Sequence, residues 1–297
     1  MDIRAILMGL AFAAMWSSAF TSARIIVADA PPLTALALRF FISGVLGVVL
    51  ARALGQSWHL TSTQWRATII FGLCQNALYL GLNFVAMQTI EASLAAIVAS
   101  SMPLLVGLAG AVFLGERIGA FGFAGLLSGV AGVALIMGTR LEGGADMFGL
   151  ILCVLGVLAL TVATLTVRGA TSGGNLLMIV GLQMLIGSAA LAVVGLATEP
   201  LVINWSWKLG AAFAYTTLIP GLAATLVWFA LVNRIGATRA ATFHFLNPFL
   251  GVVIAALILG ESLGLWDIIG VLIATAGIFA VQISRQRDQK GPKPRRT

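Results

Sequence analysis

Charged residues are scarce in this chain of 297 residues: Asp, Glu, Lys and Arg make up 9% of it, whereas soluble proteins carry about 25%. Apolar residues make up 60% of the chain, and its mean hydropathy is +1.05. This composition excludes an ordinary soluble globular domain and places almost the whole chain in a lipid bilayer. The apolar runs are long and do not alternate with polar residues, so they predict membrane-spanning helices and not a barrel.

Residues that bind metals or perform covalent catalysis are also few. The chain has two cysteines, Cys74 and Cys153, which do not form a Cys-x-x-Cys motif, and two histidines, His59 and His244. A disulfide or metal framework is therefore not expected. A membrane-embedded enzyme needs clustered His, Asp or Glu, or a nucleophile and base at one depth. We therefore predict no catalytic residue, no metal site and no cofactor.

Acidic residues are missing from the clear middle of every apolar run. If the chain is a carrier, this absence favours uniport or exchange, because carriers driven by protons or sodium usually keep an acidic residue there. Arg39 is the sole basic residue well inside a run. Three roles stay open for it: snorkelling to the interface, pairing with helix-end carbonyls, or contacting a substrate carboxylate. A carrier of sugar phosphates would need buried Lys or Arg pairs, so a neutral or zwitterionic substrate fits better.

Ten apolar runs have the length of membrane-spanning helices, and turn residues separate them. We expect spans at 3–27, 33–51, 66–88, 92–114, 120–138, 147–168, 175–197, 208–232, 237–259 and 265–283. No loop is long enough for a soluble domain. The end of the chain, 285–297, is polar, basic and contains proline, so we expect a disordered tail there.

One stretch of the chain returns about 145 residues later, which is the mark of an internal repeat. Residues 92–116 read ASLAAIVASSMPLLVGLAGAVFLGE, and residues 237–261 read ATRAATFHFLNPFLGVVIAALILGE. Without any gap, Pro103 falls on Pro248, Gly115-Glu116 falls on Gly260-Glu261, and later glycines stay in register. We therefore predict two repeats, at 1–141 and 146–284, ahead of the tail at 285–297.

Basic residues gather at one side of the predicted membrane. If the N-terminus is cytoplasmic, the outer loops hold only Arg24, Arg140 and Lys208, and the other side holds Arg4, Arg52, Arg66, Arg117, Arg168, Arg234, Arg239 and the basic tail. The positive-inside rule then predicts that both termini are cytoplasmic. The formal charge of +7 is thus a topology signal. It implies no nucleic-acid partner, although the tail is able to touch anionic lipid.

An odd number of spans in each half has a consequence for the architecture. Two alike halves of five spans must cross the membrane in opposite directions, as in the inverted repeats of secondary transporters. The predicted fold is therefore an all-α membrane protein of ten transmembrane helices in two inverted five-helix repeats, with a substrate site between the halves. The glycine stripe of the fifth span (Gly122, Gly125, Gly129 and Gly132) predicts close helix packing or a dimer surface, so we expect a monomer or a weak homodimer.

The repeated pattern resembles the EamA domain of the drug/metabolite transporter superfamily. It consists of Pro103, Gly115-Glu116 and the glycine-rich fifth span, and again of Pro248, Gly260-Glu261 and the tenth span. The resemblance covers the whole chain in two copies. It implies a multi-pass carrier of the bacterial inner membrane that exports amino acids or related metabolites. The chain also resembles the YddG-type exporters of aromatic amino acids.

The third span offers the clearest set of candidate binding residues. Asn76, Tyr79 and Asn83 are spaced by three and four, so they share one helical face. Their neutral polar groups suit the amino or carboxylate group of a substrate. The alternative is that they hydrogen-bond neighbouring helices as structural contacts.

The ninth span and its repeat mate contribute further candidates. His244 and Asn247 lie one turn apart before Pro248, and Ser100 lies just before Pro103. Proline removes a backbone donor and clashes with the carbonyl one turn back. We therefore expect Pro103 and Pro248 to be hinges and the carbonyl of His244 to be freed. The alternative is a kink that only serves packing.

Aromatic and hydroxyl side chains complete the predicted site. Trp228 with Tyr79 and Phe243 would form a wall for a ring-bearing substrate, although aromatics in membranes are also packing residues and interface anchors. Trp16 and Ser17 of the first span are candidates of the same kind. The functions left open are a carrier for nucleosides, amines, drugs or sugar phosphates, and a sensor or scaffold, which would lack a wide polar-lined cavity.

Overall fold

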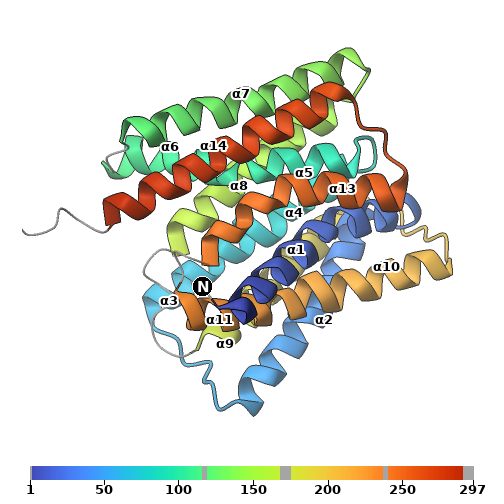
Figure 1. Cartoon of the computed structure of the whole chain (residues 1–297). Coiled ribbons are helices and arrows are strands. Elements are labelled where there is room, and N and C mark those ends of the chain that lie inside the picture. Colours follow the sequence, from blue (N-terminus) through green and yellow to red (C-terminus); the bar gives the residue numbers. More distant parts are fainter. Residues whose placement is uncertain (1, 116–118, 168–174, 237–239, 290–297) are drawn as a thin grey trace, which may run out of the picture.

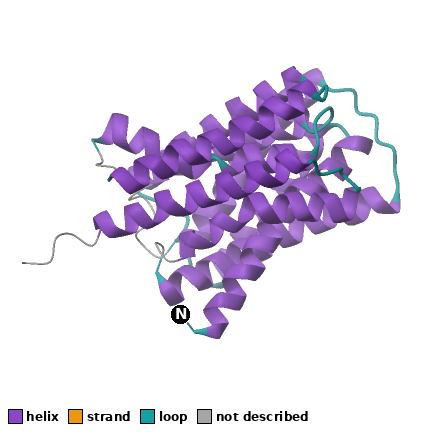
Figure 2. Ribbon diagram, turned by 45° about the horizontal axis from the view of Figure 1, so that its top comes forward, coloured by secondary structure: helices purple, strands orange, loops and turns teal. Residues whose placement is uncertain are grey.

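The computed structural model describes residues 2–115, 119–167, 175–236 and 240–289, and no strand occurs in these ranges. The helices run along a shared direction, and the loops gather at the two ends of the bundle (Figure 2). The N-terminus and the last turns of α14 lie toward the same end, at the left of Figure 1. The predicted all-α class is confirmed.

The helices have the following bounds in chain order. They are α1 (Ile3–Asp29), α2 (Pro32–Ala53), α3 (Ser62–Phe71), the π-helix η1 (Gly72–Tyr79), α4 (Leu80–Ala86), α5 (Ala92–Ser100), α6 (Met102–Leu114), α7 (Ala120–Glu142), α8 (Met147–Val167), α9 (Leu176–Thr198), α10 (Trp207–Leu218), the π-helix η2 (Ile219–Ala223), α11 (Ala224–Ile235), the 3₁₀ helix η3 (Ala241–Leu246), α13 (Asn247–Leu259) and α14 (Leu265–Gln289).

Nine stretches of the described chain are long and apolar enough to cross a membrane, and Phe243–Leu259 is a shorter apolar helix. Together they correspond to the ten predicted spans. Helix α14 continues to Gln289, so the beginning of the predicted disordered tail is helical instead. Residues 290–297 of that tail lie outside the described residues.

Large apolar side chains cover the outside of the bundle. Phe113 and Leu257 are each 80% exposed, and Val193 is 71% exposed. Exposed apolar surface on this scale is costly in water. These side chains therefore match a bundle whose surroundings are lipid.

Four predicted spans are not continuous α-helices, and two of the breaks lie at the predicted hinge prolines Pro103 and Pro248. The third is broken by η1 and the eighth by η2, which contains Pro220; the fourth is broken at Ser101, before Pro103, and the ninth by η3, before Pro248. Proline lacks the N–H that would continue the backbone hydrogen bonds of an α-helix. At such a break the chain adopts the wider turns of a π-helix or the tighter turns of a 3₁₀ helix. The carbonyl of His244 is not freed as predicted, because it accepts the N–H of Asn247 in a 3₁₀ bond.

The two most extensive helix pairings join α7 to α14 and α2 to α9. Figure 1 shows α7 and α14 side by side. Their backbones touch through glycine: a Cβ on Gly277 would lie 2.3 Å from the nitrogen of Gly129, and a Cβ on Gly132 would lie 2.6 Å from that of Ala274. The glycine stripe of the fifth span is thus covered by α14 of the same chain and not exposed for a dimer.

Glutamates hold the first turns of two helices. The Glu261 carboxylate accepts the N–H groups of Ala92, at 2.8 Å, and Ser93, at 3.0 Å. The Glu199 carboxylate likewise accepts the N–H groups of Leu33 and Thr34 at the start of α2. These bonds satisfy donors that a helix start leaves unpaired. Glu261 thereby stabilises the start of α5, while its repeat mate Glu116 lies outside the described residues.

The contact between α7 and α14 predicts that adding one methyl group at Gly277 destabilises the protein. Gly277→Ala should lower the melting temperature of the purified protein by roughly 5 °C, because overpacking costs about 2 kcal/mol. Gly138→Ala is the matched control, since a Cβ there would meet nothing within 4 Å, and it should leave the melting temperature unchanged or slightly raised. Equal melting temperatures for the two variants would contradict this packing.

Candidate functional site

A cavity of about 460 Å³ lies inside the bundle, and residues from both halves of the chain line it. Ligand sites for small molecules commonly fall between about 300 and 1,000 Å³, with apolar walls and a few polar groups. The lining here has that character, with Phe20, Phe40 and Leu160 beside Asn76 and Gln183. The cavity has room for a small organic molecule.

Most of the predicted site residues meet at this cavity. Those that line it are Asn76, Tyr79, Asn83, Trp228, His244, Asn247, Ser100, Trp16, Ser17 and Pro103. Phe243 does not line it, because its ring packs against Gly9 beside buried Ala5 and Leu231. The prediction that Phe243 belongs to the aromatic wall is therefore wrong. Pro248 is buried one residue beyond Asn247 and does not line the cavity either.

Four rings in the cavity wall form an aromatic cluster, which we define as Phe12, Trp16, Trp228 and His244. The ring centroids of Phe12 and Trp228 are 4.8 Å apart, and the His244 ring lies 5.1 Å from each of them. Phe12 was not predicted, although its spacing of four from Trp16 places both on one helical face. The cluster offers an apolar surface to a ring-bearing ligand.

Helix α1 is linked to the break in the ninth span by a small polar network. The Ser17 hydroxyl donates to the backbone carbonyl and to Oδ1 of Asn247, both at 3.4 Å. Nδ2 of Asn247 lies 3.0 Å from Nδ1 of His244. Because an amide nitrogen only donates, Nδ1 accepts, and the neutral imidazole carries its proton on Nε2. His244 is thereby oriented by its neighbours.

The amides of the third span are already engaged within the protein. Nδ2 of Asn76 donates to the carbonyl of Gln183 at 2.9 Å, and Nδ2 of Asn83 donates to the carbonyl of Tyr79 at 2.8 Å. The Cys153 thiol donates to Oδ1 of Asn83 at 3.4 Å. These contacts match the structural alternative for both asparagines. Their role, and that of Tyr79, in substrate binding stays a prediction.

Arg39 also lines the cavity, although it was not among the predicted site residues. It is 6% exposed, and its Nε donates to the carbonyl of Thr216 at 3.2 Å. Pro220 has no N–H to give that carbonyl one turn back, so Arg39 supplies the missing donor. The Ser43 hydroxyl donates to the next carbonyl, that of Thr217, also at 3.2 Å. The signal in the sequence was a single basic residue deep inside an apolar span.

The two ends of the cavity differ in exposure. At the end where α3 and α9 begin, the lining includes half-buried Gln64 and Leu176. At the opposite end it reaches Phe84 and Met87, which are 2% and 1% exposed. Arg24 donates to the carbonyl of Met87 and holds that end together. The cavity is thus more accessible from the end where α3 and α9 begin.

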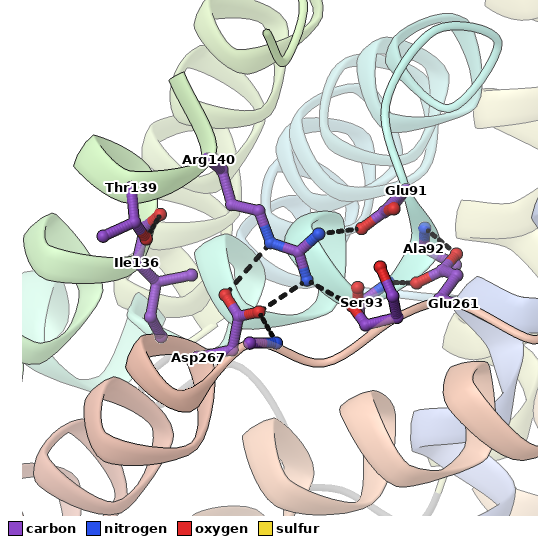
Figure 3. A network of polar contacts seen from close by, with 10 residues as sticks. Glu91, Ala92, Ser93, Ile136, Thr139, Arg140, Glu261 and Asp267 are labelled. Atoms are coloured by element: carbon purple, nitrogen blue, oxygen red, sulfur yellow. Dashed lines mark hydrogen bonds and ion pairs between the residues drawn. The ribbon is translucent and has the colours of Figure 1, made fainter. Parts of the chain in front are cut away.

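The less accessible end also carries a set of ion pairs, which we name the Arg140 network (Figure 3). Arg140, near the end of α7, pairs with Glu91 at 2.5 Å and with Asp267 of α14 at 2.9 Å, and it donates to the carbonyl of Ser262 at 3.3 Å. Burial raises the pKa of Glu91, and the charge of Arg140 opposes that rise. The network joins the starts of α5 and α14 to the end of α7.

Polar contacts continue in the neighbouring loop. The Asp146 carboxylate accepts the hydroxyl of Thr89 and the N–H of Gly149, each at 2.8 Å. The hydroxyl of Thr89 and the nearby N–H groups lower the pKa of Asp146. In the part of the chain that the structure describes, no three His, Cys, Asp or Glu side chains gather as a metal site.

Comparison with known proteins adds the family. The chain is 26% identical to the "Uncharacterized transporter YvbV" of Bacillus subtilis, covering 93% of this chain and 90% of the relative. It is 26% identical to the "Uncharacterized transporter sll0355" of Synechocystis, covering 93% and 88%, and 23% identical to the "WAT1-related protein At3g02690, chloroplastic" of Arabidopsis thaliana, covering 92% and 68%. None of these three names states a substrate.

A solved crystal structure has the same fold. It aligns with a TM-score of 0.68 and 21% sequence identity, over 97% of this chain and 100% of the other. The model of the EamA-like transporter family matches residues 3–138 and again residues 147–283. With the apolar helices of spanning length, these likenesses indicate a multi-pass membrane protein, and a transporter rather than an enzyme. The chain belongs to the EamA-like transporter family.

Proposed function

We propose that this protein is a secondary transporter that exports amino acids, aromatic ones included, or related small metabolites across the bacterial inner membrane. The observation that carries the proposal is the cavity of about 460 Å³ between the halves, with one end more accessible and the other held by the Arg140 network. A carrier that works by alternating access needs one site that opens to each side in turn. Binding would shift an existing equilibrium between the two states.

Contacts between α7 and α14 support the inverted repeat. The repeat register places Gly125 on Gly270 and Gly132 on Gly277. A Cβ on Gly125 would lie 2.9 Å from the carbonyl oxygen of Gly277, and a Cβ on Gly132 would lie 2.7 Å from that of Gly270. Exchanging the two halves turns each contact into the other. This reciprocity is what a two-fold relation between inverted halves requires.

The orientation follows from charge. We place both termini in the cytoplasm, which the positive-inside bias favours. We also propose that the protein is a monomer or a weak homodimer. The accessible end of the cavity is then cytoplasmic, because α3 and α9 begin there and the N-terminus lies at the same end of the bundle (Figure 1). The Arg140 network would close the outer end, so this conformation faces inward.

Transport by purified protein in proteoliposomes tests the proposed function. We expect counterflow of at least one amino acid, and a panel that includes nucleosides, amines and a sugar phosphate covers the alternatives. Tyr79→Ala and Asn83→Ala should lower the rate while expression and monodispersity persist. Absence of amino acid transport by folded protein would overturn the amino acid proposal, and transport of another class would redirect it. Normal transport by both variants would show that the site lies elsewhere.

The aromatic cluster makes a separate prediction about substrate shape. Trp228→Ala removes a ring from the cavity wall. The affinity for a ring-bearing ligand should therefore fall by about tenfold, which corresponds to the loss of one aromatic contact. Trp207→Ala is the control, because that side chain is 94% exposed. Thermal shift titration measures both. Equal affinities in the two variants would remove the cluster from the site.

The Arg140 network predicts how the outer end opens. Arg140→Gln leaves Asp267 buried without its partner, and an unpaired buried charge is unfavourable. Hydrogen exchange should therefore become about tenfold faster at the backbone of 91–93 and 262–267. Arg234→Gln, which breaks the exposed pair with Asp2, should leave these segments unchanged. Unaltered exchange in Arg140→Gln would show that the network does not hold this end.

A further inference from the structure

Arg39 is unusual among the cavity residues because it carries a charge and has no charged partner among the residues that the structure describes. It comes from α2 and is 6% exposed. Among the described lining residues it is the one Arg or Lys, and no Asp or Glu lines the cavity with it. Its guanidinium lies over the ring of Phe40, with Cζ 5.0 Å from the centroid. A buried charge in an apolar site is strongly unfavourable unless an opposite charge pairs with it.

The structural role of Arg39 uses only part of its guanidinium. Nε donates to the carbonyl of Thr216 that Pro220 leaves without a donor. Nη1 and Nη2 form no hydrogen bond or ion pair with the residues described. Among the described residues, the polar side-chain atoms that are both fully buried and without a hydrogen-bond partner are Thr21 Oγ1, Ser93 Oγ, Thr275 Oγ1 and Gln282 Oε1. Nη1 and Nη2 of Arg39 are not fully buried. The two terminal nitrogens therefore retain access to the cavity.

A glycine keeps space open beside these nitrogens. Gly221 follows Pro220 in η2 and lines the cavity. A Cβ at this position would lie 3.7 Å from Nη2 of Arg39 and 3.2 Å from Oγ of Ser43. A side chain here would contact the guanidinium and the hydroxyl of Ser43. Glycine leaves space beside Nη2, in the lining of the cavity, that a ligand is able to occupy.

We propose that Arg39 binds the carboxylate of the transported molecule through Nη1 and Nη2. A guanidinium presents two parallel N–H groups that match the two oxygens of a carboxylate. With Nε held by Thr216, the end of the fork formed by Nη1 and Nη2 remains for the ligand. The aromatic cluster receives the apolar part of the same molecule. This assignment rests on the proposed transport function and narrows its substrates to those that bear a carboxylate.

A series of ligands that differ only in the carboxylate tests the proposal in wild-type protein. The probes are phenylalanine, its amide and its methyl ester, and the measurement is the ligand-dependent shift in melting temperature, converted to an affinity. We expect phenylalanine to bind at least tenfold more tightly than the amide or the ester, because hydrogen bonds to charged groups contribute more than neutral ones. Equal affinities would overturn the role of Arg39. This arm needs no variant, so it does not depend on the folding of one.

Variants then assign the effect to this residue. Arg39→Gln should weaken phenylalanine binding by about ten- to a hundredfold and leave the binding of the amide nearly unchanged. Arg39→Lys should restore part of the loss, since it keeps the charge but not the fork. Arg52→Gln, an exposed arginine in the last turn of the same helix, is the control and should bind like the wild type. A loss in Arg39→Gln that is equal for acid and amide would show a structural role only, and would overturn the proposal.

Transport separates this proposal from the broader one. If wild-type protein transports the amide and the ester as well as phenylalanine, the transporter proposal stands and the carboxylate assignment fails. If it transports no compound of the wider panel, both fail together. If it transports phenylalanine and not the amide or the ester, and Arg39→Gln abolishes that preference, both are supported.

Discussion

Direct backbone contact between helices of the two halves is the constraint on which the rest of this structure depends. In lipid, helices gain little from hiding apolar surface from water, so close packing through small residues becomes the main attraction. Gly125, Gly132, Gly270 and Gly277 bring α7 and α14 together in this way, and Gly44 and Gly181 bring α2 and α9 together. In both pairs the backbone of one helix lies directly against the backbone of the other.

These two pairings set the boundary of the site. Because each joins one helix from either half, the remaining helices must pack between them, and it is these helices that contribute the interruptions η1, η2 and η3. Each interruption leaves backbone groups that a bilayer cannot satisfy. Side chains satisfy several of them: Arg39 and Ser43 donate to carbonyls beside η2. Polar residues are thus placed around the cavity by the needs of broken helices as well as by a ligand.

Much of this arrangement was predictable from the sequence, and the reasons are specific. Low charge and long apolar runs identify the spans, and prolines in matching positions locate the breaks in the fourth and ninth. Polar residues inside spans, such as Asn76 and His244, do line the cavity. Each of these signals exists because a polar side chain or an unpaired backbone group has an unfavourable free energy in lipid. The family follows from the repeated Pro and Gly-Glu pattern and is confirmed by the family match.

Other features depended on local geometry that the sequence does not state. The π-helix η1 has no proline to announce it, and η3 turns by 3₁₀ geometry, so the rotation per residue differs from that of an α-helix. Faces assigned by α-helical spacing therefore drift in these segments, and Phe243 packs against Gly9 and does not line the cavity. Arg39 had three open roles because its partner is the carbonyl of Thr216 near the end of α10, 177 positions away in sequence. Only the packed structure brings them together.

The central claim is that one cavity is open to one side of the membrane at a time. A single cysteine at Ser100, which lines the cavity, introduced after replacing Cys74 and Cys153, tests it with a membrane-impermeant thiol reagent applied to either side of sealed vesicles. The account predicts that labelling is faster from the cytoplasmic side without substrate, and that a transported substrate changes the two rates in opposite directions. Rapid labelling from both sides at once, as in a channel, or rates that substrate leaves unchanged from both sides would contradict it.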